Sequence, residues 1–382
     1  MRWSRTSWLF VAVACAVLAP SSAQAVKLKL TEDAFLDLHV LIQPQAQARE
    51  NGNATGDSVG FDLFLRRARL IVAGAVTRDL TFFIDVDAPN FGKGGNFAVD
   101  LYVQDAFASY KLFPELIVDA GLLIAPLTHH TVQGATSLNT ADYHAFLVKY
   151  PTGSNKVWRD AGLQLRGLLL GGLFQYRVGA FGGMRGASGR KDEAGKPLPD
   201  VNPQGIPRFA GHLRLNVFDP EPDMFFAGTY FRKKKVLSFG LVGDVQPKAV
   251  AVKGQVNDYV AVGGDVFLDL PVAQASEVVF QANAINYWQG DLSPATGVAL
   301  FAEAGYRWKW IGPVVSYERF VSKTGAGHLQ TFHLGLNFWI EEHQANVKAD
   351  LAFEQDCAAQ KKTRLADTKV VSVLTVQGQL YF

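Results

Sequence analysis

The sequence predicts an all-β protein: a transmembrane antiparallel β-barrel of about 16 strands with short periplasmic turns and long extracellular loops. Three observations favour this fold: an N-terminal export signal, recurrent alternation of apolar and polar residues, and a last strand that ends on Phe382. Alternate side chains of such strands meet lipid and lumen. Closure of the barrel gives every backbone polar group a partner, which lipid cannot supply.

An export signal occupies the N-terminus. Two arginines precede an apolar run over 8–18, and an Ala-Gln-Ala cleavage site follows at 23–25. We therefore expect residues 1–25 to be a secretory signal that is removed, and residues 26–382 to form one domain. The apolar run is too short to cross a bilayer, and the mature chain has no run of about 18 apolar residues, so helical membrane spans are not expected.

Cysteine content and charge exclude several classes of function. Cys357 is the only cysteine beyond the signal, so the mature chain cannot form an internal disulfide. Cys15, inside the signal, leaves lipoprotein processing as the less favoured alternative. Removal of the signal takes Arg2 and Arg5 from 37 basic residues and leaves 35 against 35 acidic ones. A neutral chain does not suit nucleic acid, and no cofactor is expected.

Strand-like segments recur from one end of the mature chain to the other, with no helical spacing between them. In order, they lie near 34–46, 61–76, 80–88, 99–112, 115–125, 158–170, 173–183, 208–218, 236–246, 258–270, 276–288, 298–310, 313–322, 329–340, 345–355 and 370–382. These are sixteen segments, an even number, as a single-chain bacterial barrel requires.

The connections between these segments alternate in length, which is typical of outer-membrane barrels. Short turns, expected at the periplasmic end, lie at 77–79, 113–114, 171–172 and 311–312. Long connections, expected on the outside, lie at 47–60, 126–157, 184–207 and 356–369. One connection departs from the pattern, because 219–235 should be periplasmic and yet is long. We expect an extended turn with its own local structure there, with a miscounted pair of strands as the alternative.

Alternation sorts the side chains of each strand into a lipid face and a lumen face. In the segment 158–170, the expected outward residues are Ala161, Leu163, Leu165 and Leu169. In the last segment they are Leu374, Val376, Leu380 and Phe382. A cluster of aromatic residues beside a short turn is expected at headgroup depth, and consists of Tyr306, Trp308 and Trp310.

Several stretches resemble the phosphate-selective porins O and P. The sequence FLRRARL at 64–70, followed by DLTF at 79–82, is similar to the second and third strands of that family. Further similar stretches are DAFASY at 105–110, the strand end at 121–126, RDAGLQL at 159–165 and QGQLYF at 377–382. The resemblance implies a sixteen-stranded barrel, commonly trimeric, that passes phosphate, polyphosphate or other small anions. In the third loop the chain has DYHAFL at 142–147, where typical members carry a Glu-Arg pair.

Inward arginines are candidates for anion selectivity, and they are Arg67, Arg69, Arg166, Arg177 and Arg214. A Gly-Gly hairpin at 171–172 places Arg166 directly opposite Arg177, and two such charges repel unless an anion or a carboxylate lies between them. Arg214 on the next strand extends this wall. Arg69 is expected opposite Asp87, which neutralises it. The alternative interpretation is that these arginines shape the field of a general pore or pair with carboxylates.

The connection 126–157 is long enough to fold into the lumen and narrow it. Its candidates for lining the constriction are His129, His130, His144 and Lys149. The spacing of these histidines and Asp142 matches no recognised ligand pattern, so no metal site is expected.

Together these features predict a porin in the bacterial outer membrane. We expect a water-filled channel for passive diffusion of small hydrophilic solutes, with a mild preference for anions, phosphate among them, and no catalytic residue. The expected partners are outer-membrane lipid, lipopolysaccharide, the solutes, and further copies of the chain in a homotrimer. Two other classes stay open: an outer-membrane hydrolase, for which His333 and Ser316 are inward polar groups, and a secreted soluble β-rich binding protein.

Overall fold

A computed structural model describes residues 26–98, 100–144, 148–151, 158–186, 195, 200–325, 329–356 and 370–382. The predicted signal, part of the third loop and of the connection 184–207, and all but the first residue of the connection 356–369 lie outside the described residues. The strands are β1 (Val26–Lys29), β2 (Phe35–Arg49), β3 (Gly60–Ala75), β4 (Leu80–Asp87), β5 (Tyr102–Phe113), β6 (Leu116–Ile124), β7 (Arg159–Leu169), β8 (Phe174–Phe181), β9 (Arg208–Asn216), β10 (Val236–Val252), β11 (Gln255–Ala273), β12 (Ser276–Trp288), β13 (Gly297–Trp308), β14 (Ile311–Ser322), β15 (Leu329–Glu341), β16 (Ala345–Asp356) and β17 (Val371–Tyr381). The short helices are η2 (Lys93–Gly95), α2 (His129–Val132) and η4 (Leu170–Gly172).

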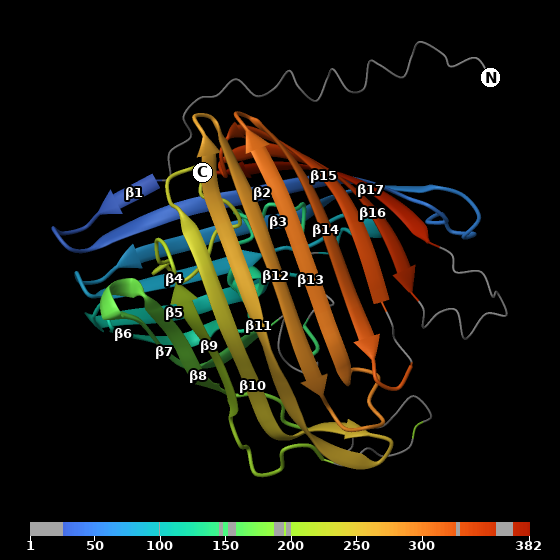
Figure 1. Ribbon diagram of the computed structural model, residues 1–382, viewed down its shortest axis with the longest axis horizontal. Coiled ribbons are helices and arrows are strands. Elements are labelled where there is room, and N and C mark those ends of the chain that lie inside the picture. The colour runs from blue at the N-terminus through green and yellow to red at the C-terminus, as the bar shows by residue number, and fades with distance from the viewer. Residues whose placement is uncertain are drawn as a thin grey trace.

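Strands β2 to β17 form a closed antiparallel barrel (Figure 1). Each strand pairs with the next along the chain, and β17 returns to pair with β2, from Val373 opposite Arg49 to Tyr381 opposite Leu41. In Figure 1 the early strands, blue to green, form one side of the barrel and the later strands, yellow to red, form the other. Each of the sixteen predicted segments overlaps one of these strands, so the predicted fold class and strand count are confirmed.

A short additional strand, β1, is not predicted by the sequence. It pairs with the start of β2, with Val26 opposite Leu38. Strand β17 pairs with β2 only from Leu41 onward, and β3 takes the other edge of β2. β1 therefore covers the stretch of edge that β17 leaves unpaired, which keeps those backbone groups from being exposed.

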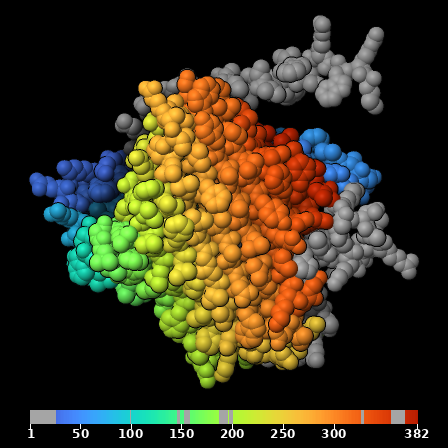
Figure 2. All heavy atoms as spheres, in the orientation of Figure 1, coloured from blue at the N-terminus to red at the C-terminus, as the bar shows by residue number. Residues whose placement is uncertain are grey.

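The barrel wall is apolar on the outside and polar on the inside. In β17 the side chains of Leu374 and Val376 are 46% and 40% exposed, whereas Gln377 is 1% exposed. In β7 Leu163 is exposed and Gln164 is buried. Figure 2 shows the outer face of the later strands, in yellow and orange, as a continuous convex surface. The predicted sorting into two faces is confirmed, and it is opposite to that of a soluble protein, which buries its apolar residues.

The aromatic cluster beside the turn between β13 and β14 lies on the outer face. Tyr306, Trp308 and Trp310 are all exposed, and the ring of Trp310 stacks on Phe338 with centroids 5.9 Å apart. Amphipathic rings at a strand end match the headgroup level of a bilayer. Within the described ranges, no helix is both long enough and apolar enough to cross a membrane.

Strands β10 and β11 extend well past their predicted ends and meet at a tight turn at Lys253 and Gly254. The register shifts between Gln246 and Val250, where Lys248 has a φ of 53°. This bulge absorbs the residues around Pro247, which has no backbone N–H to donate. The hairpin then continues with regular pairing, so the polar interruption bends the strands and does not end them.

Residues 217–235, between β9 and β10, lie at the end of the barrel where the short turns are, and contain no strand. We call them the insert. Its base is hairpin-like: the amide of Asp219 donates to the carbonyl oxygen of Lys235 at 2.8 Å. Its middle enters the lumen, where Glu221 and Phe226 are each 1% exposed. The expectation of local structure is correct, and no pair of strands is miscounted.

Candidate functional site: the barrel lumen

The third loop connects β6 to β7, and its described residues, 125–144, 148–151 and 158, enter the barrel and follow its inner wall. It begins with the turn α2, whose N-cap Thr128 forms a capping box with Thr131. The next amide, that of His129, donates to the carboxylate of Asp265 on β11 at 2.9 Å. The loop is thus fixed to a wall strand that lies five strands away from β6, from which the loop departs.

Wall side chains then hold the backbone carbonyls of the third loop. Asn337 on β15 donates to the carbonyl oxygen of Asn139 at 2.7 Å, and Lys348 on β16 donates to that of Thr140 at 3.0 Å. Buried carbonyl groups need such donors, since an unpaired one is costly. The contacts explain how an irregular segment can lie inside the barrel.

Asp142 anchors the third loop to β3. One of its carboxylate oxygens lies 2.6 Å from Nη2 of Arg67, and the other pairs with Arg66. Successive strand residues normally point to opposite faces, but Arg66 is the extra residue of a β-bulge opposite Gln43 and Pro44, so both arginines reach the lumen. Burial opposes ionisation of Asp142, but the two guanidinium groups outweigh it and hold its pKa well below its usual value.

The insert presents its backbone carbonyls to the arginines of β7 and β8. The carbonyl oxygen of Pro222 accepts from Arg166 at 2.6 Å. Those of Asp223 and Met224 accept from the two terminal nitrogens of Arg177, each at 2.6 Å. The repulsion between the two facing guanidinium groups is thus reduced by neutral carbonyl dipoles and by the carboxylate of Asp119, which pairs with Arg166.

The following part of the insert presents its backbone amides to acidic residues on β11 and β12. The amide of Tyr230 donates to Asp269 at 2.6 Å, and that of Arg232 donates to Glu277 at 2.5 Å. The two ends of the insert therefore match walls of opposite charge. This complementarity of backbone dipoles and wall charges stabilises the insert across the lumen.

Glu221 is the most highly connected side chain of the insert. Its carboxylate accepts from Arg214 at 2.5 Å, lies 3.0 Å from Nε2 of His129, and accepts from the hydroxyl of Tyr230. Burial opposes its ionisation, but His129 and Arg214 outweigh burial and hold the pKa of Glu221 well below its usual value. The buried anion links the wall, the insert and the third loop.

Phe226 joins the insert to the third loop. It forms a parallel β-bridge with Gln133. Its ring centroid lies 4.2 Å from the guanidinium carbon of Arg177 and 4.4 Å from that of Arg214. Two cations over one desolvated ring gain cation–π attraction, which offsets part of their mutual repulsion. The insert and the loop thus form one connected obstruction within the lumen.

Two cavities flank this obstruction. An outer cavity of about 530 Å³ opens toward the long connections, and its lining includes Arg66, Asp142, His144, Glu318, His333 and Asp350. An inner cavity of about 240 Å³ lies toward the short turns, and its lining includes Arg69, Asp85, Asp105, Arg159, Asp223 and Tyr230. The loop residues 140–144 line the outer cavity and 134–137 line the inner one, so the third loop separates them.

The five predicted arginines all have partners inside the barrel. The register places Arg166 opposite Arg177, as the Gly-Gly hairpin predicts, and Arg69 opposite Asp87. Arg69 pairs with both Asp85 and Asp87, at 3.0 and 2.9 Å, and is neutralised as expected. Arg166 pairs with Asp119 at 2.9 Å. Arg67 contacts Asp142, and Arg214 contacts Glu221, as described above. The insert covers Arg166, Arg177 and Arg214.

The four predicted loop residues occupy different environments. His144 lines the outer cavity. His129 is buried, with its ring stacked on Phe267 at 3.7 Å, and His130 is buried against the ring of Phe301 at 4.6 Å. Lys149 lies with its Nζ 4.2 Å from the ring centroid of Phe320.

Sequence reasoning predicted local structure in the insert but did not place the insert in the lumen, and it did not identify Glu221 and Asp142 as anchoring carboxylates. The adjacent pair Phe225-Phe226 in a connection expected to be in water was the available signal, because two large apolar rings there need a buried site. No signal in the sequence pairs Glu221 with Arg214 or His129, since that contact depends on how the insert enters.

The hydrolase alternative finds a partial geometry at Ser316, which is buried. The hydroxyl of Ser316 lies 3.3 Å from Nε2 of His144, whose Nδ1 lies 3.4 Å from Glu318. This order of groups resembles a nucleophile, a base and an orienting acid. Ser316 is 3% exposed, however, and is not among the residues that line the outer cavity, so a substrate has no approach to it there.

The fold is shared with several solved structures, whereas neither protein-family models nor curated proteins match the sequence. The outer membrane channel DcaP of Acinetobacter baumannii has 13% identity and a TM-score of 0.58, with 94% of this chain and 100% of that chain covered. An anion-selective porin from Comamonas acidovorans has 12% identity and a TM-score of 0.60, with 92% and 100% covered.

OmpT, an outer membrane protein of Vibrio cholerae solved in a trimer form, has 12% identity and a TM-score of 0.52, with 92% of this chain and 100% of that chain covered. Identities this low show the fold alone. The chain has the fold of porin-like outer-membrane channels, and its closer relation to phosphate-selective porins stays a prediction.

Proposed function

We propose that the protein is an outer-membrane porin through which small hydrophilic solutes diffuse passively, with a mild preference for anions. The observation that carries this proposal is the inverted polarity of a closed wall, apolar outside and charged inside. Lipid solvates such an exterior, and closure leaves no unpaired strand edge in the bilayer. The predicted signal supports export through the periplasm, with residues 1–25 removed.

The two cavities support a solute path on either side of the third loop. We propose that solutes move from the outer cavity past residues 134–144 into the inner cavity. Because the insert lies across the lumen beside this stretch, its position sets how much of the cross-section is open. Polar and charged linings on both sides favour hydrophilic solutes, which replace part of their hydration with wall contacts.

Arg177 supports the anion preference. Its terminal nitrogens donate to two neutral carbonyl oxygens, and the described residues include no carboxylate within ion-pair distance of it. Its positive charge is therefore not cancelled locally. The opposite wall carries Asp269 and Glu303, so the field across the lumen has two signs and the preference is mild. The anion-selective porin from Comamonas acidovorans shares the fold and is consistent with this proposal.

A reversal potential across a salt gradient tests the proposal. In planar lipid bilayers the wild-type protein is expected to form channels that favour chloride over potassium. The Arg177→Gln variant is expected to reduce the anion-to-cation permeability ratio by less than about fivefold. One unit charge at 4 Å is worth about 1 kcal/mol in water-like surroundings, and the insert keeps passing ions farther than that from the buried Arg177. Arg177→Lys keeps the charge and is the matched control, with a ratio near that of the wild type.

Cation selectivity of the wild type, or equal ratios for Arg177→Gln and Arg177→Lys, contradicts the anion preference. Phosphate is the next solute to test. A decrease in chloride conductance at low added phosphate indicates a binding site for it in the lumen, whereas an unblocked, ohmic conductance indicates a general pore.

We also propose that three copies assemble in the membrane, surrounded by lipid and lipopolysaccharide. The resemblance to phosphate-selective porins implies a trimer, and OmpT of Vibrio cholerae, with the same fold, was solved in a trimer form. Outward side chains of β3, with Phe61 82% exposed and Leu63 76% exposed, supply apolar area that lipid or another copy could cover.

A further inference from the structure

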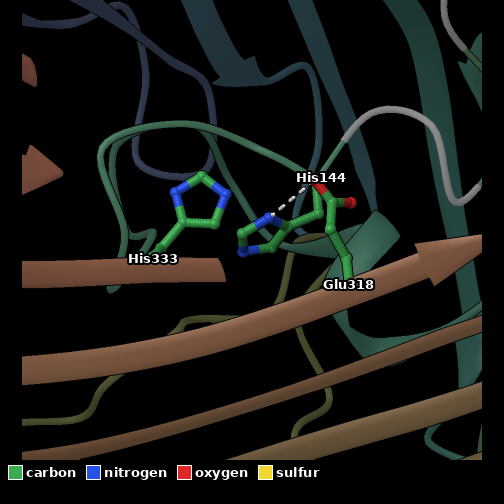
Figure 3. A group of neighbouring side chains, drawn as sticks. All are labelled: His144, Glu318 and His333. Carbon is green, nitrogen blue, oxygen red and sulfur yellow. Dashed lines mark ion pairs between the residues drawn. The ribbon is translucent and has the colours of Figure 1, made fainter. Parts of the chain in front are cut away.

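Three potential metal ligands meet at the wall of the outer cavity (Figure 3). They are His144 on the third loop, Glu318 on β14 and His333 on β15, and one ligand atom from each lies within 4.8 Å of the others. Glu318 and His333 are diagonal neighbours on the same face, since Ser316 is opposite His333 in the register. All three residues line the outer cavity, so an ion can reach them from solvent.

The hydrogen bonds of both histidines leave one nitrogen of each available. Nδ1 of His333 lies 2.9 Å from the carboxylate of Asp350, and its Nε2 is buried with no hydrogen-bond partner. Nε2 of His144 lies 3.3 Å from the hydroxyl of Ser316, and its Nδ1 faces Glu318 at 3.4 Å. A carboxylate that accepts from one ring nitrogen fixes the tautomer in which the other can bind a metal.

Glu318 adds an unused acceptor to the cluster. The residue is 4% exposed, and its Oε2 has no hydrogen-bond partner among the described residues. A buried carboxylate oxygen and a buried imidazole nitrogen without partners are costly, because each has lost water and gained nothing in exchange. Because one ligand atom from each of the three residues lies within 4.8 Å of the others, a cation bound among them would supply the missing partner.

We propose that His144, Glu318 and His333 bind one divalent transition-metal cation of the zinc class. Two imidazole nitrogens and one carboxylate oxygen are a set that zinc accepts, with a fourth position left for water from the cavity. Hard cations such as Mg²⁺ prefer oxygen ligands and are expected to bind much more weakly. Asp350 acts as a positioning residue for His333.

The site joins elements that are far apart in the sequence. A bound ion ties the third loop to the neighbouring strands β14 and β15, just above the stretch that separates the two cavities. It is therefore expected to stabilise the loop against the wall and to place positive charge in the outer cavity. Binding can be measured in detergent, so the inference does not depend on the proposed channel function.

Titration calorimetry of the detergent-purified protein, stripped with EDTA, tests the site directly. We expect one Zn²⁺ per chain and no comparable heat with Mg²⁺. The His333→Ala and Glu318→Gln variants are expected to abolish this binding, and Asp350→Asn to weaken it about 10–100-fold, as loss of a metal-orienting carboxylate does. His39→Ala is the matched control, since His39 lies near the short-turn end, stacked on Tyr381, and should bind as the wild type does.

Absence of Zn²⁺ binding by the wild type, or wild-type affinity in His333→Ala, overturns the proposal. Folding of each variant is checked by its heat-dependent migration on a gel. If a variant fails to fold, X-ray absorption at the zinc edge of the wild-type complex identifies the atoms that bind the ion. Two imidazole ligands with a carboxylate oxygen support the site, and coordination without imidazole contradicts it.

Discussion

At the scale of single residues, the lumen is organised by charged groups that find partners from other segments. Arg177 and Arg166 face each other, as the hairpin geometry requires, and remain stable there because carbonyl dipoles of the insert and Asp119 lie beside them. Glu221 shows the same principle with opposite sign, since an isolated buried carboxylate would neutralise and this one is held ionised by Arg214 and His129.

The Glu221→Gln variant is expected to loosen the insert. Removing one partner of a buried ion pair costs about 3–5 kcal/mol, because the remaining charge of Arg214 stays buried without compensation. The insert should then leave the lumen more often, and single-channel recordings should show a larger mean conductance or more frequent openings than the wild type.

Asp219→Asn is the matched control on the same segment. Asp219 is exposed at the base of the insert and lines neither cavity, and its carboxylate accepts from the backbone amide of Lys235, which an Asn side-chain oxygen also accepts, so this variant should conduct as the wild type does. Equal conductance of Glu221→Gln and the wild type would show that the carboxylate does not hold the insert.

At the scale of elements, connection length and strand ends decide what fills the barrel. The turn between β7 and β8 is tight because Gly171 and Gly172 have φ of 68° and 96°, a region that glycine adopts without a steric penalty. The connection between β9 and β10 has 17 more residues than a two-residue hairpin would need, since it spans 217–235. That surplus forms the insert, and without it the arginine wall would face water.

Replacement of 220–234 by Asn-Gly tests this view of the insert. The amide of Val217 donates to the carbonyl oxygen of Leu237 and that of Asp219 to Lys235, so Asp219 and Lys235 form a hydrogen-bonded pair that a two-residue turn closes in register. We expect a folded barrel with several-fold higher conductance and a stronger anion preference, because Arg166, Arg177 and Arg214 lose their carbonyl and carboxylate partners from the insert.

The same deletion combined with Arg177→Gln separates the two effects. The conductance of this double variant should stay as high as that of the deletion variant, whereas its anion preference should be lower than that of the deletion variant. An unchanged conductance in the deletion variant would show that the insert does not limit flow, and this result would count against the proposed solute path.

At the scale of the whole molecule, closure couples the two ends of the chain. β17 pairs with β2, and Val40 and Phe382 exchange backbone hydrogen bonds at 2.8 and 3.2 Å. Among the described strands of the barrel, none has an edge left for water or another chain, which is the condition for stability in lipid. The apolar exterior makes this molecule depend on a membrane or detergent.

Extraction and gel migration test the assembled state. The protein is expected in the outer-membrane fraction and should be soluble only with detergent. On a native gel it should migrate as a species of about three chains. Boiling should dissociate this species and unfold the barrel, and the unfolded chain should migrate more slowly than the folded monomer. Val40→Pro, which removes the amide that donates to Phe382, should weaken closure and lower the temperature at which migration changes.

A conservative change at the same position, Val40→Ile, keeps that amide and should behave as the wild type does. Recovery of the protein in the culture supernatant without detergent would instead support the secreted, soluble alternative. Detergent-dependent monomers would contradict the trimer and leave the barrel intact.

The sequence alone was sufficient for the wall. Alternation with a period of two residues predicts that Leu374 and Val376 point outward and Gln377 inward, and turn geometry predicts that Arg166 faces Arg177. Both features depend only on neighbours in the chain or across one hairpin. The count of sixteen strands follows for the same reason.

Only the tertiary structure decided the contents of the lumen. Glu221 meets His129, and His144 meets Glu318 and His333, across separations that no local period records. Those contacts depend on the path of the insert and of the third loop through the closed lumen. Which groups lie beside a buried side chain there determines whether it is ionised, is neutral or can bind a metal.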